Sequence, residues 1–273
     1  MSYCIGSLNL RGGKKATKHQ RDFYEILYRI ITGEDFVLFA FQEDATVRSN
    51  SVIDDLLGTG ATALSQRGWD GFHMPGPDKS SEFSFIWDST RVQPCTIPGI
   101  FNTVKMCRSP LCGNFAVISE GSRFAFPYEF RLINIHLVHE RSCSPKNLGL
   151  KGKEARKLEC EHVKNDIYEN IQSHIPEDGI RHIFTVALGD YNLNCEDSNQ
   201  CLPSRIKTFQ SENTTLNING DYCNSYDHFS FDIIHNETVE NKSMRINVLK
   251  YCESIEHYRG NVSDHVPIKL EIF

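Results

Sequence analysis

The sequence predicts an α/β domain in which β-sheets pack against each other and helices cover their outer faces. Two patterns support this fold class. Short apolar segments typical of buried strands alternate with a few segments of helical spacing, and the last segment is again a strand. No repeat, low-complexity segment or linker divides the chain, so residues 1–273 are expected to form a single domain. With 40% hydrophobic residues, a chain of this length is able to bury a large core.

The first half of the chain begins with alternating strands and helices. Residues 3–10 predict a buried strand, and residues 36–42 form a continuous apolar run that is typical of a central strand. Between them, residues 18–31 carry apolar side chains three or four positions apart, which predicts a helix. A shorter helix is expected at residues 51–57. The stretch that follows is rich in strand patterns separated by Gly and Pro, and its clearest strands are residues 83–87, 114–118 and 131–137.

The second half contains the longest helical segment, residues 151–175, followed by a buried strand at residues 182–188. Residues 191–225 are polar and predict loops, with one short helix near residues 204–209. The chain then returns to strand patterns, at residues 226–234, 245–250 and 266–273.

The overall charge of the chain is acidic, with a formal net charge of −6. A dedicated non-specific nucleic-acid binder is usually basic, although a local basic face is compatible with an acidic total. Two basic clusters offer such a face or are solvated surface: Lys14, Lys15, Lys18 and Arg21, and Lys146, Lys151, Lys153, Arg156 and Lys157. Ten cysteines occur without any Cys-x-x-Cys pair, which argues against a structural zinc site.

No segment of the sequence indicates a membrane anchor. Residues 1–8 lack the basic flank and apolar core of a signal peptide, and no apolar run is long enough to span a bilayer. We therefore expect no membrane span. The chain as written is expected to be cytoplasmic, or secreted if it is a mature domain from which a signal has been removed.

Polar residues recur where apolar strands end. Strand ends lie along one rim of a sheet, so residues far apart in sequence are able to converge there. Carboxylates and amides suit Mg²⁺ or Mn²⁺, and two histidines near carboxylates suit general acid–base catalysis. The combination predicts hydrolysis of a phosphate ester by water. The residues at these positions are Asn9, Gln42, Glu43, Asn134, His136, Asp190, Asn192, Asp264 and His265.

These motifs resemble, in their order, those of the endonuclease/exonuclease/phosphatase family, and they span nearly the whole chain. Each motif alone is weak, but five of them in order, each at a strand end, indicate the family. The resemblance implies a deoxyribonuclease-like, four-layer sandwich: two mixed β-sheets packed face to face and flanked by helices. It also implies a monomer that uses Mg²⁺, with Mn²⁺ or Ca²⁺ as alternatives.

Further features resemble one branch of the family, the pancreatic-type deoxyribonucleases. Glu82 matches a glutamate that pairs with the first catalytic histidine. Arg108, in an Arg-x-Pro sequence, matches an arginine that faces the scissile phosphate and stabilises its charge. Cys195 and Cys223 lie near the positions of a long-range disulfide, although the second spacing is off by one residue. The resemblance implies this disulfide, with reduced thiols as the alternative.

The resemblance also implies a role for each residue of the first catalytic group. Glu43 would bind the metal ion with help from Asn9, and Asp264 would bind the metal or support its ligands. His136, held by Glu82, would be one acid–base group.

The second acid–base group would be His265, held by Asp227. Asp232 is an alternative partner on the same hairpin, but the sequence Tyr-Asp-His-Phe around Asp227 fits the family pattern better. Asp190 and Asn192 would orient water and phosphate. The sequence does not decide which histidine activates water and which protonates the leaving oxygen.

The chain departs from the pancreatic-type pattern in regions that grip double-stranded DNA. Ala45 stands where those enzymes carry an arginine, with Arg48 the nearest candidate, and the loop after Trp69 is shorter. The first hypothesis is a metal-dependent endonuclease on DNA, or also on RNA. The second is an esterase for an inositol phosphate, a nucleotide or a sphingomyelin-like lipid, since one fold serves many substrates. The third is a catalytically silent binding module.

Overall fold

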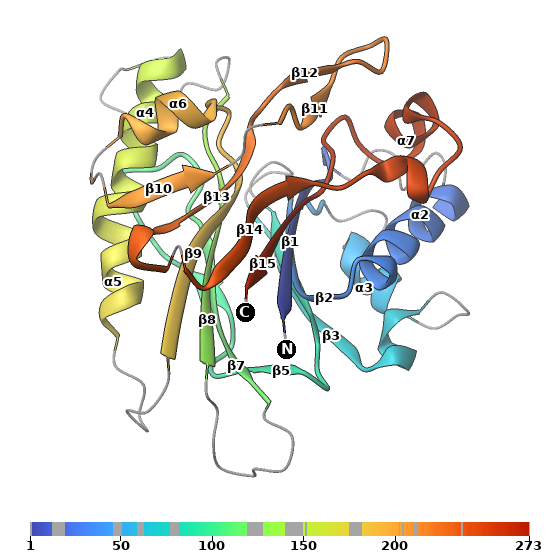
Figure 1. Cartoon of the computed structure of the whole chain (residues 1–273), viewed down its shortest axis with the longest axis horizontal. Coiled ribbons are helices and arrows are strands. Elements are labelled where there is room, and N and C mark those ends of the chain that lie inside the picture. The colour runs from blue at the N-terminus through green and yellow to red at the C-terminus, as the bar shows by residue number, and fades with distance from the viewer. Residues whose placement is uncertain are drawn as a thin grey trace.

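Two β-sheets lie face to face at the centre of the molecule, and helices cover the outer face of each (Figure 1). The strand order is β14-β15-β1-β2-β4-β3 in the first sheet and β10-β13-β9-β8-β7-β5 in the second, with β6 paired to β7. The computed structural model describes residues 2–12, 20–45, 51–58, 63–76, 82–118, 128–139, 150, 152–174, 182–201, 203, 205–209, 212–235 and 237–272.

Both sheets are mixed, because each contains one parallel pair among antiparallel neighbours. The parallel pairs are β1 with β2 and β8 with β9. The strands of the first sheet are β1 (Tyr3–Asn9), β2 (Phe36–Gln42), β3 (Trp69–Met74), β4 (Phe83–Asp88), β14 (Val239–Arg245) and β15 (Ile268–Ile272). Those of the second are β5 (Val92–Pro94), β6 (Gly99–Ile100), β7 (Leu111–Val117), β8 (Tyr128–His136), β9 (His182–Asp190), β10 (Ile206–Phe209) and β13 (Asp227–Asp232).

Helices form the two outer layers. The first sheet is covered by α2 (Gln20–Gly33), α3 (Val52–Leu57) and α7 (Ile255–Asn261), and the second by α4 (Gly152–His162), α5 (Tyr168–Ser173) and α6 (Cys195–Asn199) (Figure 1). Ser51 caps α3, since its side chain accepts a hydrogen bond from the Asp54 amide while Asp54 accepts one from the Ser51 amide. The four layers confirm the predicted sandwich.

The core has one apolar layer between the sheets and one under the helices on each side. On β2, Leu38 and Ala40 pack between the sheets, whereas Phe39 and Phe41 pack toward the helices. Both faces of β2 are therefore buried, and this burial explains its continuous apolar sequence. Among the described helices, none combines the length and apolar character needed to cross a membrane.

Two of the predicted elements are wrong. The short helix expected near residues 204–209 is the strand β10, in which Ile206 and Thr208 are buried while Lys207 and Phe209 are half-buried, an alternation of period two. The strand expected at residues 245–250 lies earlier: β14 ends at Arg245, and a 3₁₀ turn follows at Val248–Lys250. β10 is a strand because it pairs with β13, and the position of β14 is set by its pairing with β15. The sequences of these two strands are too polar to predict this.

Two other regions differ in detail from the prediction. The long helix expected at residues 151–175 is divided into α4 and α5 by a π-helical turn at Val163–Ile167. The polar stretch 191–225 is not only loop, because it contains α6 and the hairpin of β11 (Thr215–Leu216) and β12 (Tyr222–Asn224). This hairpin lies at the same end of the molecule as the catalytic residues predicted from the sequence.

Candidate active site

A buried polar clamp joins the two sheets below the site. The Gln42 amide donates hydrogen bonds to Asn134 Oδ1 (2.7 Å) and to Ser7 Oγ (3.1 Å). Asn134, from the second sheet, donates in turn to the carbonyl oxygens of Phe41 (2.9 Å) and Ser84 (3.3 Å) in the first. The side chains of Ser7, Gln42 and Asn134 belong to fully buried residues, so these bonds are shielded from water. The clamp fixes the strand ends of one sheet against those of the other.

The predicted catalytic residues converge because the two parallel strands of each sheet end at the same rim of the molecule. Asn9 ends β1 beside Gln42 at the end of β2, and Glu43 follows directly. In the second sheet His136 ends β8 directly opposite Asp190, which ends β9. His136 Nε2 lies 3.6 Å from both Glu43 Oε1 and Asp190 Oδ2, although these belong to different sheets. The convergence expected from strand ends is thus present.

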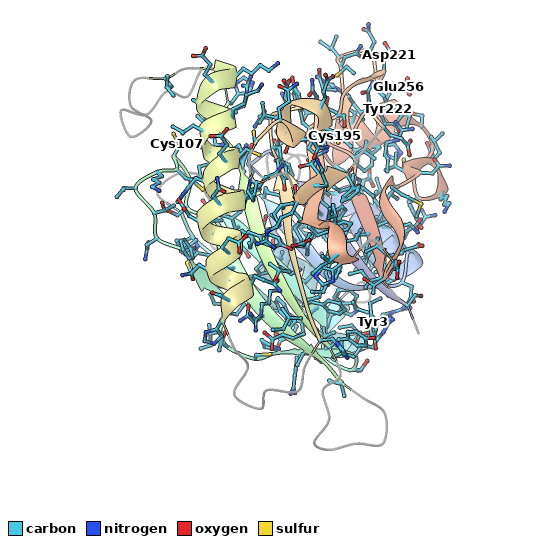
Figure 2. The ribbon with its side chains drawn as sticks, turned by 60° about the vertical axis from the view of Figure 1, so that its left-hand side comes forward. Tyr3, Cys107, Cys195, Asp221, Tyr222 and Glu256 are labelled. Atoms are coloured by element: carbon cyan, nitrogen blue, oxygen red, sulfur yellow. The ribbon has the colours of Figure 1, made fainter. Side chains whose placement is uncertain are left out.

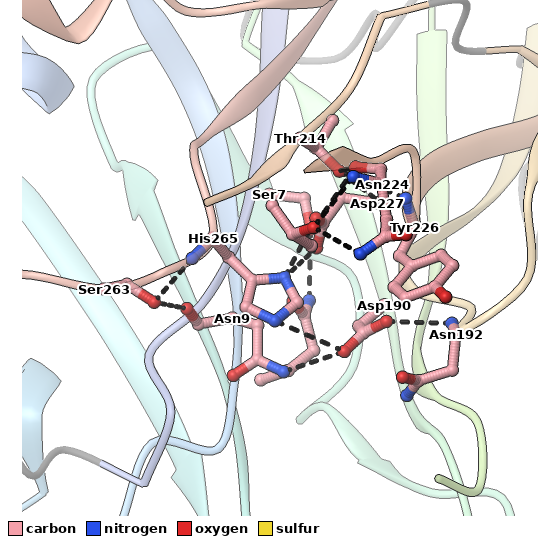
Figure 3. Close-up of polar contacts among 12 residues, drawn as sticks. Ser7, Asn9, Asp190, Asn192, Thr214, Asn224, Tyr226, Asp227, Ser263 and His265 are labelled. Atoms are coloured by element: carbon pink, nitrogen blue, oxygen red, sulfur yellow. Dashed lines mark hydrogen bonds and ion pairs between the residues drawn. The ribbon is translucent and has the colours of Figure 1, made fainter. Parts of the chain in front are cut away.

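Asp190 lies at the centre of this group (Figure 3). Its carboxylate accepts hydrogen bonds from the Asn9 amide (3.0 Å) and the Asn192 backbone N–H (2.8 Å), and it lies 3.8 Å from His265 Nε2. Burial, together with the negative charge of Asp227, raises the pKa of Asp190 to about 6, against the opposing effect of the His265 charge. Asp190 is therefore able to exchange a proton near neutral pH.

His265 is held by Asp227, as the sequence pattern favours. Its Nδ1 lies 3.1 Å from Asp227 Oδ1 and 3.0 Å from Oδ2, which leaves Nε2 directed toward Asp190 (Figure 3). Burial acts to lower the pKa of His265, but the charges of Asp227 and Asp190 outweigh it and raise the pKa to about 10. The alternative residue, Asp232, instead pairs with Arg205.

The turn after β9 is shaped by unusual backbone conformations. Gly189 has φ +133°, and a Cβ there would lie 2.1 Å from the carbonyl oxygen of Ile135, so only glycine fits. Asn192 has φ +47°, and its amide donates to the carbonyl of Leu137 (3.1 Å). Arg108 donates to the same carbonyl (3.0 Å), so its guanidinium lies at the end of β8. Arg108 and Asn192 therefore border the same side of the site.

The residues predicted to bind metal also lie together at this rim. Asn9 donates to Glu43 Oε1 (3.3 Å), and Asp264 pairs through Oδ2 with Arg11 (2.6 Å). Asp264 Oδ1 is buried, and no residue in the described part of the chain forms a hydrogen bond with it. The described residues contain no cluster of three or more His, Cys, Asp or Glu ready to enclose an ion. Mg²⁺ usually takes only one or two protein carboxylates and completes its shell with water and phosphate, so this donor set fits it.

A cavity of about 340 Å³ opens over these residues. Seven of the predicted residues line it: Glu43, Arg108, His136, Asp190, Asn192, Asp264 and His265. Arg11 also lines the cavity and was not predicted, although its place two residues after the strand-end Asn9 was a usable signal. The wall contributed by the β11–β12 hairpin was not predicted either: Thr215, Leu216, Cys223 and Asn224, with Tyr226 beside them.

The hairpin is tied to the segment that carries Asp264 and His265. The Leu216 amide donates to the Asp264 carbonyl (2.7 Å), and Thr215 forms an isolated antiparallel bridge with His265. At the hairpin tip, a Cβ on Gly220 would lie 3.3 Å from Glu256 of α7, and Figure 2 shows the neighbouring tip residues close to Glu256. The hairpin is thus a fixed wall of the cavity, and its polar sequence explains why it was predicted to be loop.

Two expectations from the resemblance have different outcomes. For Cys195 and Cys223 the structure shows the second of the two alternatives: neither is disulfide-bonded, and Cys195 Sγ donates to the Thr208 carbonyl (3.0 Å) while Cys223 lies by Thr215. Glu82 is buried beside His73, with Oε2 3.4 Å from Nε2 of that ring. Its predicted pairing with His136 stays a prediction.

The predicted basic clusters are only partly described. Lys14, Lys15, Lys18, Lys146, Lys151 and Arg48 lie outside the described residues. In the second cluster, Lys153 and Lys157 pair with Asp197 and Arg156 is buried, so these three side chains are engaged within the protein.

Solved structures with the same architecture span the whole chain. Two structures of D. rerio TDP2, one humanized by 14 mutations and one complexed with single strand DNA product, align with TM-scores of 0.63 and 0.61 at 15% and 16% identity. Each match covers 100% of this chain and 99% of the other. The chain therefore has the endonuclease/exonuclease/phosphatase fold. At this level of identity the likeness concerns the fold alone.

The same fold appears in two proteins of Bacteroides thetaiotaomicron. An endonuclease/exonuclease/phosphatase family protein matches with a TM-score of 0.63 and 14% identity, over 100% of this chain and 95% of the other. A mannosyl-6-phosphatase matches with a TM-score of 0.62 and 14% identity, over 99% of this chain and 100% of the other. No protein-family profile and no curated protein sequence matches the chain. These matches support the wider fold group and give no specific support to its pancreatic-type branch.

Proposed function

We propose that this protein is a Mg²⁺-dependent phosphodiesterase that hydrolyses nucleic acid, with DNA favoured over RNA. The observation that carries the proposal is the buried line of Asp227, His265 and Asp190, which meets His136 and Glu43 at the floor of one cavity. Carboxylates on both sides of an imidazole hold it in one orientation and stabilise its charged form. Such a group is suited to acid–base work on a phosphate ester.

The chemistry requires a base for water and an acid for the leaving oxygen. His265 has one ring nitrogen fixed by Asp227 and the other directed into the cavity, and His136 faces the same carboxylate from the other sheet. One histidine would remove the proton of the attacking water, and the other would protonate the departing oxygen. Asp190, with its pKa near 6, would orient the water between them, and Asn192 would hold the phosphate.

Cations would stabilise the negative charge that develops on the phosphate. Arg108 is buried at the cavity wall and anchored on the Leu137 carbonyl, so its guanidinium would meet phosphate oxygens with little loss of freedom. Glu43, with Asn9 and Asp264, would hold Mg²⁺, with Mn²⁺ or Ca²⁺ as alternatives. The bound ion would act as a Lewis acid on a phosphate oxygen.

Support for a nucleic-acid substrate comes from the pancreatic-type features of the sequence and from the fold shared with TDP2, one structure of which holds single strand DNA product. A second candidate is a small phosphate ester such as a sugar phosphate. It is favoured by the shared fold of a mannosyl-6-phosphatase and by the limited volume of the cavity, which the β11–β12 hairpin walls on one side. An inositol phosphate, a nucleotide or a lipid ester belongs to the same class of candidate.

The test is a substrate panel with purified protein and Mg²⁺ or Mn²⁺. Supercoiled plasmid, single-stranded DNA, RNA and a hexose 6-phosphate are incubated with wild type and with His265→Ala, with and without EDTA. His182→Ala is the matched control, because His182 is exposed at the other end of the strand that carries Asp190. Plasmid or DNA cleavage lost only with EDTA and His265→Ala supports the proposal. Phosphate release from the sugar alone supports the second candidate, and turnover of none of the four by folded protein contradicts both.

A further inference from the structure

A second cluster of buried polar side chains lies behind the candidate active site. His73 has only 12% of its side chain exposed, and a carboxylate lies at each of its ring nitrogens. Nδ1 is 3.2 Å from Asp44 Oδ2, and Nε2 is 3.4 Å from Glu82 Oε2. Ser84 Oγ lies 3.1 Å from the same Nδ1 and also contacts Asp44. None of these contacts involves the cavity floor itself.

The cluster connects two segments that carry predicted site residues. Asp44 directly follows Glu43 in the turn after β2, and Glu82 directly precedes β4. His73 lies on β3, paired with Ser84 of β4, so its ring reaches both segments from the edge of the first sheet. Asp44 is fully buried, and its Oδ1 also accepts the Val52 amide (2.7 Å) at the start of α3. His73 is therefore in contact with one side chain from each of these two segments, Asp44 and Glu82.

Two carboxylates around one imidazole favour the doubly protonated ring. The ring makes its hydrogen bond to Asp44 through Nδ1, while Nε2 stands at ion-pair distance from Glu82, so a positive charge on the ring would be attracted from both sides. Burial acts to lower the pKa of His73, but the hydrogen bond to Asp44 and the charges of Asp44 and Glu82 outweigh it and raise the pKa. A positive charge on this ring would reduce the repulsion between the two buried carboxylates and favour one position for each.

The turn that carries Glu43 needs such support. Glu43 has φ +53°, a backbone conformation that is strained for a residue other than glycine. Its turn is held by the Asp44 amide, which donates to the Glu82 carbonyl (3.2 Å), and by the side-chain contacts of Asp44. Asn134, two residues before His136, donates to the Ser84 carbonyl, so the end of β8 also lies against this segment.

We propose that His73 is a positioning residue of the active site, which couples the turn bearing Glu43 to Glu82 at the start of β4. Because the Ser84 carbonyl of β4 accepts from Asn134, this coupling also fixes the end of β8 that carries His136. This inference rests on the proposed function for its catalytic consequence. His73 does not line the cavity and does not touch the substrate; it acts through Asp44 and Glu82. Substitution of such supporting groups typically costs about 10–100-fold in activity or metal affinity.

The first test is a double-mutant cycle on a generic phosphodiester, bis-p-nitrophenyl phosphate, with Mg²⁺. His73→Gln is expected to lower kcat at least about 10-fold with KM changed less than about twofold. In a Glu82→Gln background, the same substitution is expected to change kcat less than about threefold, because its effect passes through Glu82. His235→Gln, a half-buried histidine on the other side of the molecule, is the matched control and should retain wild-type kcat. Unchanged kcat in His73→Gln, or full additivity with Glu82→Gln, overturns the proposal.

The second test does not depend on turnover. In protein labelled with ¹⁵N-histidine, the ring signals of His136 are assigned by their loss in His136→Gln. His73→Gln is expected to shift the His136 ring nitrogens, whereas His235→Gln leaves them in place. If the wild type hydrolyses no phosphate ester but the His136 signals shift, the proposed function fails and the positioning role stands. Unshifted His136 signals in folded His73→Gln overturn the positioning role whatever the activity.

Discussion

The contact between Asp227 and His265 allows a sharp test of the proposed chemistry. The carboxylate lies 3.0 Å from the ring nitrogen, and both groups are withdrawn from solvent, with 1% and 14% of their side chains exposed. For unit charges at this distance the attraction is roughly 5 kcal/mol at an effective dielectric constant of about 20. Asp227→Asn preserves the shape of the side chain and removes its charge, so a fall in activity would report the loss of this attraction.

The expected effect of Asp227→Asn is a fall in kcat of about 10²–10³-fold. This factor follows if about 3–4 kcal/mol of the attraction stabilises the charged ring in the transition state, because each 1.4 kcal/mol changes the rate tenfold. The pKa of His265, about 10 in the wild type, is expected to fall as well, because Asp227 is the first of the charges that raise it. Both quantities are measurable, kcat with bis-p-nitrophenyl phosphate and Mg²⁺, and the pKa by NMR titration of the ring.

Asp232→Asn is the matched control on the same strand. Asp232 is buried like Asp227 but pairs with Arg205. Its substitution should therefore change kcat by less than about twofold and the His265 pKa by less than about half a unit. The reasoning is refuted if folded Asp227→Asn keeps more than half of the wild-type kcat. It is also refuted if Asp232→Asn loses as much activity as Asp227→Asn.

Three further substitutions test the packing that supports the site. Burial lowers the pKa of His228 to about 4, whereas the unfolded chain binds a proton on this histidine below pH 6.5. The free energy of unfolding therefore has its full value above pH 6.5 and falls by about 2–3 kcal/mol as the pH is lowered to 4.5. Urea unfolding at both pH values should show a smaller fall in the free energy of unfolding for His228→Gln than for the wild type. An equal fall in the two proteins would contradict this. Gly189→Ala should lower Tm by several degrees or prevent folding, because its Cβ would overlap the Ile135 carbonyl; an unchanged Tm contradicts the close approach. Glu129→Gln should destabilise the fold by about 3–5 kcal/mol in urea unfolding, since fully buried Arg131 loses the carboxylate 2.6 Å from its Nε, and a loss below about 1 kcal/mol argues against the pair.

The sequence was most informative where a strand is buried on both faces. Residues 36–41 are apolar throughout, and all seven residues of β2 are buried, as expected of a strand covered on both faces. The polar residues directly after such strands were recognisable for the same reason. An apolar strand that is followed directly by Glu43, or that ends at Asp190, indicates an edge of the sheet. These residues could therefore be proposed as site residues from the sequence alone.

Strands that depend on their neighbours were not predictable in this way. β10, β14 and the β11–β12 hairpin have polar sequences, and they become strands because an adjacent strand offers its backbone hydrogen bonds. The cavity wall formed by this hairpin was therefore missed. The sequence left the disulfide and the reduced thiols open, because a resemblance in position does not determine where a thiol points.

The choice between Asp227 and Asp232 separates what the sequence determines from what the tertiary structure decides. Residues five apart on a strand face opposite sides, so the sequence alone determines that only one of the two shares a face with apolar Phe229 and Phe231. Which face meets His265 depends on the packing of the second sheet against the first, with Asp227 opposite Asp190. The role of His73 depends in the same way on three segments that meet only after β3 and β4 have paired beside β2. Local sequence fixes the faces of each strand, and only the docking of the sheets fixes which residues those faces meet.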